Sequence, residues 1–149
     1  MIHLVSCGAE KLEYPAPARD LYTGPLFTKQ LAYALAQGTP VYVLSAEHGL
    51  VDLDDVLDPY ERTMEDLDPF ETWRWSNRVA AALLTRGHRL RGEHYVILAS
   101  RAYVEPVADR VSSWTAPLAG KGIGERLQWL TRELQAIERR REAGRRVAA

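Results

Sequence analysis

Residues Val41 to Met64 read V-Y-V-L-S-A-E-H-G-L-V-D-L-D-D-V-L-D-P-Y-E-R-T-M. The first four are β-branched, aromatic or aliphatic, and a short apolar run of this kind predicts a buried strand over Val41–Leu44. The run stops at Ser45, and Gly49 permits the sharp backbone that the chain needs to leave a strand end. We expect an acidic loop to follow, because four aspartates lie between Gly49 and the next proline. Their spacing is not that of a calcium-binding loop, so a solvated face is the better interpretation.

This loop-rich segment carries several candidate catalytic side chains. Glu47 and His48 come just after the strand, and Tyr60 and Glu61 follow a proline that fixes the chain direction. Loops on a rigid scaffold often carry binding and catalysis. Because imidazole titrates near neutral pH, His48 beside Glu47 suits general acid–base chemistry. The alternative is that His48 only hydrogen-bonds the turn and that Tyr60 and Glu61 belong to a surface turn.

Two further apolar runs predict strands at Ile2–Val5 and Tyr95–Leu98. A helix is expected between the first two strands, opened by Pro25 and ended by Gly38. Asp68-Pro69-Phe70-Glu71 predicts a second helix start, with an N-cap aspartate, proline at the first position and glutamate three residues after the cap. The residues expected on the core face of that second helix are Phe70, Trp73, Ala80, Ala81 and Leu84.

The last third of the chain predicts three more elements. Pro106 disfavours a helix interior, so we expect a regular helix to begin close to it. Residues Trp114–Leu118 predict a short strand, restricted to a sheet edge by its proline. The final helix follows Gly120–Gly124, and its arginine-rich run Glu138–Arg146 is expected to be a solvated, fraying end. The positions expected to pack this helix on the sheet are Ile123, Leu127, Leu130, Leu134 and Ile137.

Strands that alternate with helices predict an α/β fold, here a single three-layer Rossmann-like domain over residues 1–149 with a small, mostly parallel sheet. Ligands of such sheets bind outside the carboxyl ends of the strands. All three predicted strands are followed by a serine, and we expect the three serines to open on one rim. The candidate ligand-binding residues at these ends are Ser6, Cys7, Gly8, Ser45, Ser100 and Arg101.

The composition limits the classes of function. With 149 residues and 46% hydrophobic side chains, the chain fits one globular domain. The formal net charge is -1, so non-specific nucleic-acid binding through a strongly basic surface is not expected. A local basic patch is compatible with this net charge. No apolar run is long enough to span a membrane, and no signal peptide pattern opens the chain. With one cysteine and no possible internal disulfide, a cytoplasmic location is expected.

Cys7 is a candidate nucleophile if Lys11 or a helix terminus stabilises its thiolate. The alternative is that Cys7 packs as a small apolar residue. The four histidines and the cysteine show no metal-ligand spacing, so neither a metal nor a cofactor is predicted.

Gly120-Lys121-Gly122-Ile123-Gly124 precedes the last helix. Backbone N–H groups at a helix start, together with a lysine, can cradle an anion, so Gly120, Lys121, Gly122 and Gly124 are candidate ligand-binding residues. The segment matches neither the Rossmann fingerprint nor a Walker loop. Its alternative interpretation is a flexible turn that lets the last helix pack.

Three short stretches stand out as motifs: Ser45–Leu50, Asp58–Glu61 with Met64, and Leu98–Tyr103. Together they resemble the peroxide stress protein YaaA family, with its serine-containing glycine-leucine turn, its Pro-Tyr segment and its Leu-Ala-Ser-x-x-Tyr turn. The opening residues Ser6-Cys7-Gly8 with Lys11, and Leu21-Tyr22, are similar to a shorter group of uncharacterised bacterial and phage proteins.

The resemblance implies a cytoplasmic α/β protein, with DNA binding and protection from oxidative damage in the longer members. It also implies that the shared turns form a ligand pocket, to which Lys11, Tyr22, Tyr60 and Tyr103 would contribute.

We therefore expect an enzyme-like domain that acts on a nucleotide, a nucleoside or a base in nucleic acid, with the N-glycosidic bond as the candidate target. Glu47, His48 or Glu61 would handle protons or stabilise a cationic sugar. Serine and tyrosine hydroxyls would orient the ligand. The alternatives are a non-catalytic DNA-binding oxidative-stress protein that uses the basic side chains of the last helix, and an inert interaction module. The oligomeric state stays open.

Overall fold

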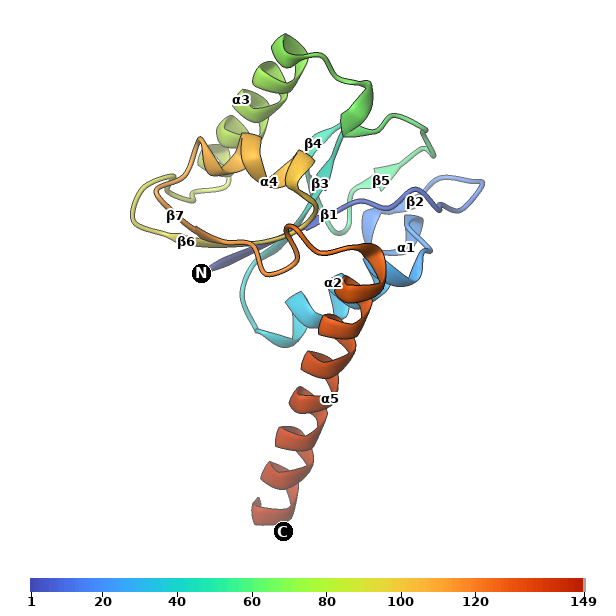
Figure 1. The fold of residues 1–149 in the computed structure, drawn as a ribbon, viewed down its shortest axis with the longest axis vertical. Helices are drawn as coiled ribbons and strands as arrows, with labels where there is room; N and C mark the ends of the chain where they lie inside the picture. Colours follow the sequence, from blue (N-terminus) through green and yellow to red (C-terminus); the bar gives the residue numbers. More distant parts are fainter. Residues whose placement is uncertain (149) are drawn as a thin grey trace.

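The computed structural model describes residues 1–148 (Figure 1). Its elements in chain order are β1 (Ile2–Ser6), β2 (Ala16–Pro17), α1 (Ala18–Leu21), α2 (Pro25–Ala36), β3 (Val41–Ser45), β4 (Gly49–Asp52), β5 (Val56–Leu57), a short 3-10 helix η1 (Met64–Asp66), α3 (Pro69–Thr85), β6 (His94–Leu98), α4 (Arg101–Ala108), β7 (Ser113–Thr115) and α5 (Ile123–Ala148).

Five strands form the main sheet in the order β4-β3-β1-β6-β7. β1 is parallel to both of its neighbours, β3 and β6, and β7 is parallel to β6. β4 runs antiparallel to β3. The three strands predicted from their apolar runs thus form the middle of a mostly parallel sheet. The edge strand predicted over Trp114–Leu118 is present as β7, but it ends at Thr115.

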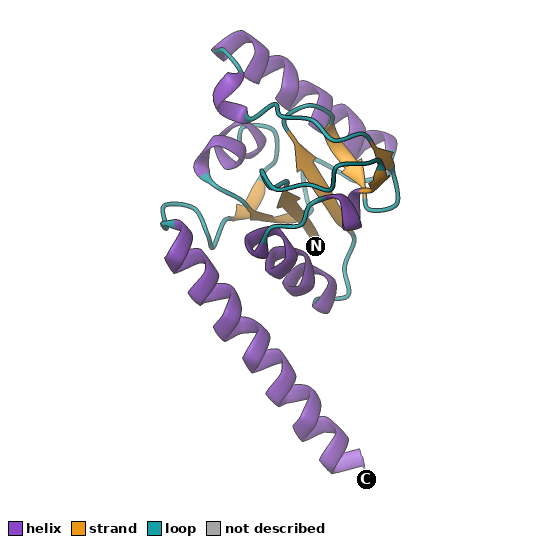
Figure 2. Cartoon of the chain, turned by 90° about the vertical axis from the view of Figure 1, so that its right-hand side faces the viewer, coloured by secondary structure: helices purple, strands orange, loops and turns teal. Residues whose placement is uncertain are grey.

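Helices cover both faces of this sheet and make three layers. α3 and α4 lie on one face, α1 and α2 lie on the other, and α5 packs mainly against α2 (Figures 1 and 2). Alternate residues of β1 face opposite layers. Leu4 belongs to the hydrophobic core that contains Trp75 of α3, and Val5 belongs to the core that contains Phe27 of α2. The predicted Rossmann-like α/β fold is therefore confirmed.

The loop predicted directly after Gly49 is wrong, because this part of the chain forms the second strand of a β-hairpin. Gly49–Asp52 pairs antiparallel with β3, so that Ser45 lies opposite Gly49. Residues 46–48 form the turn between the two strands, and Gly49 takes a positive φ of 75°. A glycine adopts this conformation without the steric cost that a Cβ would add. Glu47 and His48 therefore lie on a hairpin turn.

The start of α3 is confirmed, but of the five residues predicted on its buried face only Ala80 is buried. The carboxylate of Asp68 accepts a hydrogen bond from the backbone N–H of Glu71 at 2.7 Å, as a capping box requires. Phe70, Trp73 and Leu84 are 64%, 55% and 55% exposed. Apolar residues occur on both faces of α3, and the face that packs on the sheet is the one that carries Trp75 and Val79. The buried residues of α3 are Trp75, Ser76, Val79, Ala80 and Leu83.

Two predictions about the later helices are also wrong. α4 begins at Arg101 rather than close to Pro106, which lies inside the helix. Pro106 lacks the N–H that would reach the carbonyl of Ala102, so the short helix loses one hydrogen bond and still forms.

α5 packs mainly on α2 instead of on the sheet. Leu130 and Ile137 are buried as predicted, but Ile123 is 66% exposed and Leu127 and Leu134 are half-buried. The helix continues to Ala148, and every residue from 138 to 148 is exposed. Among the described helices, none combines the length and the apolar character needed to cross a membrane.

Candidate functional site

The carboxyl ends of β1, β3 and β6 lie along one edge of the sheet, because the three strands are parallel. Ser6, Ser45 and Ser100 therefore share that edge, as predicted from the sequence, but Ser6 and Ser45 are buried instead of open to solvent. After β1 the chain passes through α2 to β3 on one side, and after the hairpin it passes through α3 to β6 on the other side. The strand order thus reverses between β1 and β6, which is where doubly wound α/β sheets bind ligands.

A chain of hydroxyl groups begins at the buried end of β3. The hydroxyl oxygen of Ser45 lies 2.6 Å from that of Tyr60, which in turn lies 2.5 Å from that of Tyr22. The backbone N–H of His48 donates to the Ser45 hydroxyl at 3.0 Å, and the indole N–H of Trp75 donates to the Ser45 carbonyl at 2.8 Å. Ser45 is fully buried. These contacts bring the sequence-predicted residues Ser45, Tyr60 and Tyr22 together.

Lys11 and His48 both contact the ring of Tyr60. The Lys11 ammonium lies 4.6 Å from the centre of that ring and donates a hydrogen bond to the Gly8 carbonyl at 3.0 Å. A backbone bridge pairs Lys11 with Tyr22. The His48 imidazole meets the Tyr60 ring edge-on, with the ring centres 5.2 Å apart. The predicted residues Lys11, Gly8 and His48 therefore surround the hydroxyl chain.

Cys7 joins the end of β1 to α4. Its Sγ lies 3.2 Å from the phenol oxygen of Tyr103, a residue 96 positions later in the chain. The ring of Tyr103 also packs edge-on against Trp75 of α3. Ser6 is directed elsewhere, because Gln30 of α2 donates to its carbonyl at 3.3 Å and lies 3.5 Å from its hydroxyl. The contact between Cys7 and Tyr103 thus spans the ends of β1 and β6, between which the strand order reverses.

Burial changes the acidity of these phenols. Loss of water contact, followed by the nearby Cys7, raises the pKa of Tyr22 to about 12. The same two causes, in the same order, also raise the pKa of Tyr60 and of Tyr103. The three phenols therefore stay protonated at neutral pH. The two hydrogen bonds of the Ser45–Tyr60–Tyr22 chain use two of its three hydroxyl hydrogens, so this chain can donate one further hydrogen bond to a ligand. None of the three phenols can act as a base.

A second group of sequence-predicted residues meets at the carboxyl end of β6. Ser100 and Arg101 at the start of α4, and Gly120 and Lys121 before α5, line a pocket of about 420 Å³, which we call the basic pocket. The other residues that line it are Glu65, Ala102, Gly122 and Arg126. Three cationic side chains, Arg101, Lys121 and Arg126, thus approach it from two helix starts, each of which also carries partial positive charge.

Glycine is favoured at position 120 by its backbone conformation, and Arg101 lies close to it. A Cβ at this position would lie 3.4 Å from a guanidinium nitrogen of Arg101, and the backbone φ is 80°. Arg126 donates to the carbonyl of Lys121 at 2.8 Å and fixes the turn. Gly124 does not line the basic pocket, and a Cβ there would meet nothing within 4 Å.

The predicted carboxylates do not reach the basic pocket. Glu47 lines a separate hollow of about 250 Å³ on the other side of the hairpin turn, beside Arg74 and Arg78 of α3. Glu61 is exposed, and within residues 1–148 its side chain makes no hydrogen bond. Glu65 is the carboxylate that does line the basic pocket. Sequence reasoning missed Glu65 because it sits in η1, a single turn with no motif of its own.

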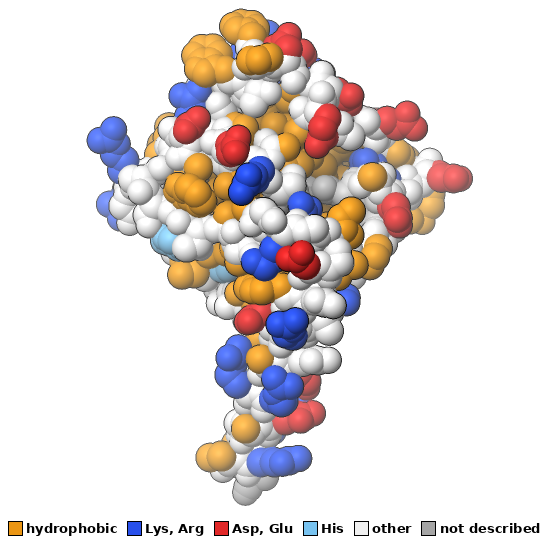
Figure 3. Space-filling model, in the orientation of Figure 1, with side chains coloured by type: hydrophobic (Ala, Val, Ile, Leu, Met, Phe, Trp, Pro, Cys, Tyr) orange, Lys and Arg blue, Asp and Glu red, His pale blue; other side chains and the backbone are white. Residues whose placement is uncertain are grey.

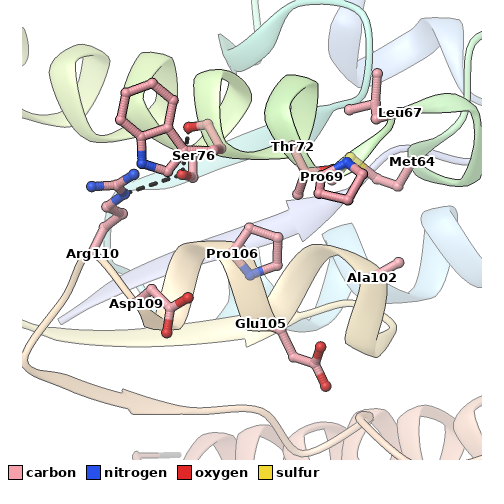
Figure 4. Close-up of a pocket in the computed structure, with 11 residues that line it drawn as sticks. Met64, Leu67, Pro69, Thr72, Ser76, Ala102, Glu105, Pro106, Asp109 and Arg110 are labelled. Carbon is pink, nitrogen blue, oxygen red and sulfur yellow. Dashed lines mark hydrogen bonds between the residues drawn. The ribbon is translucent and has the colours of Figure 1, made fainter.

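A groove of about 460 Å³ between α3 and α4 was not predicted either (Figure 4). Met64, Leu67 and Pro106 give it apolar surface, and Arg110 closes one end by donating to the hydroxyl of Ser76 at 3.1 Å (Figure 4). Ala102 lines both this groove and the basic pocket. The exposed ring of Trp73 forms part of the groove wall. The groove was missed because the sequence pattern placed Trp73 on the buried face of α3.

In the part of the chain that the structure describes, no three His, Cys, Asp or Glu side chains group closely enough to hold a metal ion. A comparison with protein families matches residues 2–132 to a family of unknown function, DUF6884. The chain belongs to this family. The matched region contains the whole sheet and every residue of the basic pocket. Comparisons with curated proteins and with solved structures found no match.

Proposed function

We propose that the chain binds a phosphorylated nucleoside at the carboxyl edge of its sheet and cleaves or transfers its N-glycosidic bond. The observation that carries this proposal is the meeting of Arg101, Lys121 and Arg126 on one pocket, at the point where the strand order reverses. The resemblance to YaaA proteins agrees with it, but DUF6884 carries no assigned function.

The basic pocket suits a phosphate for reasons of charge and shape. Cationic side chains and backbone N–H groups at helix starts form charge-assisted hydrogen bonds with phosphate oxygens. Arg101 is exposed, and Gly120 and Gly122 let an anion come close to the backbone. A neutral nucleoside would gain none of these contacts.

The hydroxyl chain suits the sugar and base. Tyr60, Tyr22 and Tyr103 are protonated donors held on a rigid scaffold, and Lys11 lies against the first two rings. Such donors can hydrogen-bond sugar hydroxyls or the acceptor atoms of a base. In this proposal the hydroxyl chain holds the sugar and base, and the basic pocket holds the phosphate.

The reaction itself would use the carboxylates at this edge. Cleavage of the bond between C1′ and the base nitrogen leaves positive charge on the sugar, which a carboxylate such as Glu65 stabilises. Water or another acceptor then bonds to C1′, and the departing base takes a proton from an acid. Of the predicted candidates His48, Glu47 and Glu61, His48 is the one whose ring packs against Tyr60 of the hydroxyl chain. In the folded chain Glu65 lies on the pocket wall, whereas the other three lie on or after the hairpin turn.

The test pairs thermal shift with detection of released base. Nucleoside monophosphates should raise the melting temperature, because a ligand at 100 times its Kd stabilises the native state by about 2.7 kcal/mol. The corresponding nucleosides should do so much less, and at least one monophosphate should release free base over time. Glu65→Gln should keep the shift and lose the release. Binding without any release, in the unaltered chain, would contradict the enzymatic half of the proposal, and no shift with any nucleotide would contradict all of it.

A further inference from the structure

A hollow of about 480 Å³, which we call the aromatic hollow, lies on the face of the sheet that packs against α2. It is lined by a row of residues paired in register across three strands, His3 of β1, Val96 of β6 and Thr115 of β7. Tyr33 of α2 and Trp129 of α5 also line it. Because α5 packs mainly on α2 and then leaves the body (Figures 1 and 2), part of the face beside β7 stays uncovered.

His3 is a buried polar side chain with one nitrogen left to bond. The residue is 1% exposed, and its Nδ1 lies 2.7 Å from the hydroxyl oxygen of Thr39. Within residues 1–148 its Nε2 has no hydrogen-bond partner. Burial lowers the pKa of His3, so the ring is neutral at neutral pH and Nε2 presents either one N–H or one lone pair. A buried polar atom without a partner costs free energy, which a bond to a ligand in the hollow removes.

Two other polar side chains of the aromatic hollow already have partners. Gln37 donates to the carbonyl of Tyr33 at 3.1 Å, and the hydroxyl of Thr115 lies 3.1 Å from Nε2 of His94. Among the described residues that line the hollow, none is an aspartate, glutamate, lysine or arginine. Basic side chains instead run along the part of α5 that projects from the body (Figure 3). The hollow therefore suits an uncharged ligand.

The rings that line the aromatic hollow determine the shape of that ligand. Tyr33 and Trp129 meet edge-on with ring centres 5.2 Å apart, and His3 meets Tyr33 in the same way at 6.3 Å. Aromatic side chains gain specific contacts from a further aromatic ring. Pockets of this size with apolar walls and a few polar groups are typical of small-molecule sites.

We propose that the aromatic hollow binds a neutral aromatic molecule of one or two rings whose hydroxyl group bonds to Nε2 of His3. A hydroxyl suits either tautomer of the imidazole, because it can donate and accept. The ring of the ligand packs against Tyr33 and Trp129. None of the residues of this hollow lines the basic pocket, so the inference does not rest on the proposed nucleotide site and the two can fail independently.

The experiment titrates the unaltered chain with para-cresol and with para-xylene, in which a methyl group replaces the hydroxyl. The indole N–H signals of the four tryptophans, followed by NMR, report the affinity and the place of binding. Para-cresol should move the signal of Trp129, and para-xylene should bind about tenfold more weakly because it leaves Nε2 of His3 without a partner. Equal affinity for the two probes would overturn the inference. No binding of either probe would mean that water alone occupies the hollow, and would overturn it as well.

Three variants locate the site. Trp129→Leu should weaken para-cresol binding about fivefold, because one aromatic contact is lost. The matched control is Trp114→Leu, since Trp114 is 43% exposed and does not line the hollow, and it should bind as the unaltered chain does. His3→Leu should bind the two probes equally.

Circular dichroism and the melting temperature show whether each variant is folded. If His3→Leu does not fold, the probe pair and the two tryptophan variants still decide. Equal effects of Trp129→Leu and Trp114→Leu would overturn the inference. Thermal shift by a nucleoside monophosphate should be the same in all folded variants, because the basic pocket is intact.

Discussion

The hydroxyl of Ser45 lies 2.6 Å from the phenol oxygen of Tyr60, which joins the buried end of β3 to a residue 15 positions later. Between the two residues the chain completes the hairpin and then pairs β5 with β2. The Tyr60 hydroxyl also bonds that of Tyr22, so it holds three separate segments at the carboxyl edge. The nucleotide site that we propose depends on this connection.

Tyr60→Phe should lower the free energy of unfolding by about 1–3 kcal/mol, because the hydroxyls of the buried residues Ser45 and Tyr22 lose a shared partner. Urea denaturation measures the change. Tyr14→Phe is the matched control, since Tyr14 is 60% exposed and a surface substitution should stay within about 0.5 kcal/mol. Equal effects of the two substitutions would mean that the hydroxyl chain contributes nothing to stability.

The strands and the start of α3 could be predicted because each depends on residues close together in sequence. Val41–Leu44 is apolar over its whole length, and Asp68 with Glu71 forms a capping box that needs only local geometry. β4 could not be predicted in the same way, because Gly49–Asp52 is short and its pairing depends on the turn. Without the pairing to β3, four residues are too few to show the apolar pattern of a strand.

The contacts that make the site depend on the fold as a whole. Cys7 meets Tyr103 and Arg101 meets Gly120 only because β1, β6 and the segment before α5 end at the same edge. Sequence reasoning could place the serines on one rim by the rule for parallel strands. It could not show that Glu61 does not line the basic pocket or that Glu65 does.

The two tryptophans of α3 should differ strongly, because the helix buries one face and exposes the other. Trp75→Ala should cost about 3–5 kcal/mol, since Trp75 is 2% exposed and its indole N–H bonds Ser45. Trp73→Ala should cost about 1 kcal/mol or less, because Trp73 is 55% exposed and its ring neighbours are the Arg110 guanidinium and the exposed ring of Phe70. Chemical denaturation of both variants compares them. A larger loss in Trp73→Ala would mean that the buried face is misassigned.

Stability should fall at alkaline pH because of the buried phenols. The pKa of Tyr22 is raised to about 12 in the folded chain, from about 10 in an unfolded chain. Below pH 10 both states hold the proton, so pH has no effect through this group. Between about pH 10 and pH 12 the unfolded state loses its proton first, which lowers the free energy of unfolding by about 2–3 kcal/mol.

Tyr22→Phe isolates this contribution, because the other tyrosines still titrate in the variant. The difference in unfolding free energy between the unaltered chain and Tyr22→Phe should shrink as the pH rises from 10 to 12. Urea denaturation at several pH values measures it. A difference that stays constant over that range would show that Tyr22 titrates with an ordinary pKa.

The most direct test of the nucleotide site compares Lys121→Ala with the unaltered chain by isothermal titration calorimetry. The two ligands are a nucleoside 5′-monophosphate and its unphosphorylated nucleoside, and Arg91→Ala controls for loss of one positive charge outside the basic pocket. Lys121→Ala should weaken monophosphate binding about tenfold, equivalent to about 1.4 kcal/mol, because it removes one charge-assisted contact. Nucleoside binding should not change, and Arg91→Ala should alter neither. Equal weakening of both ligands by Lys121→Ala would show that the basic pocket does not hold the phosphate.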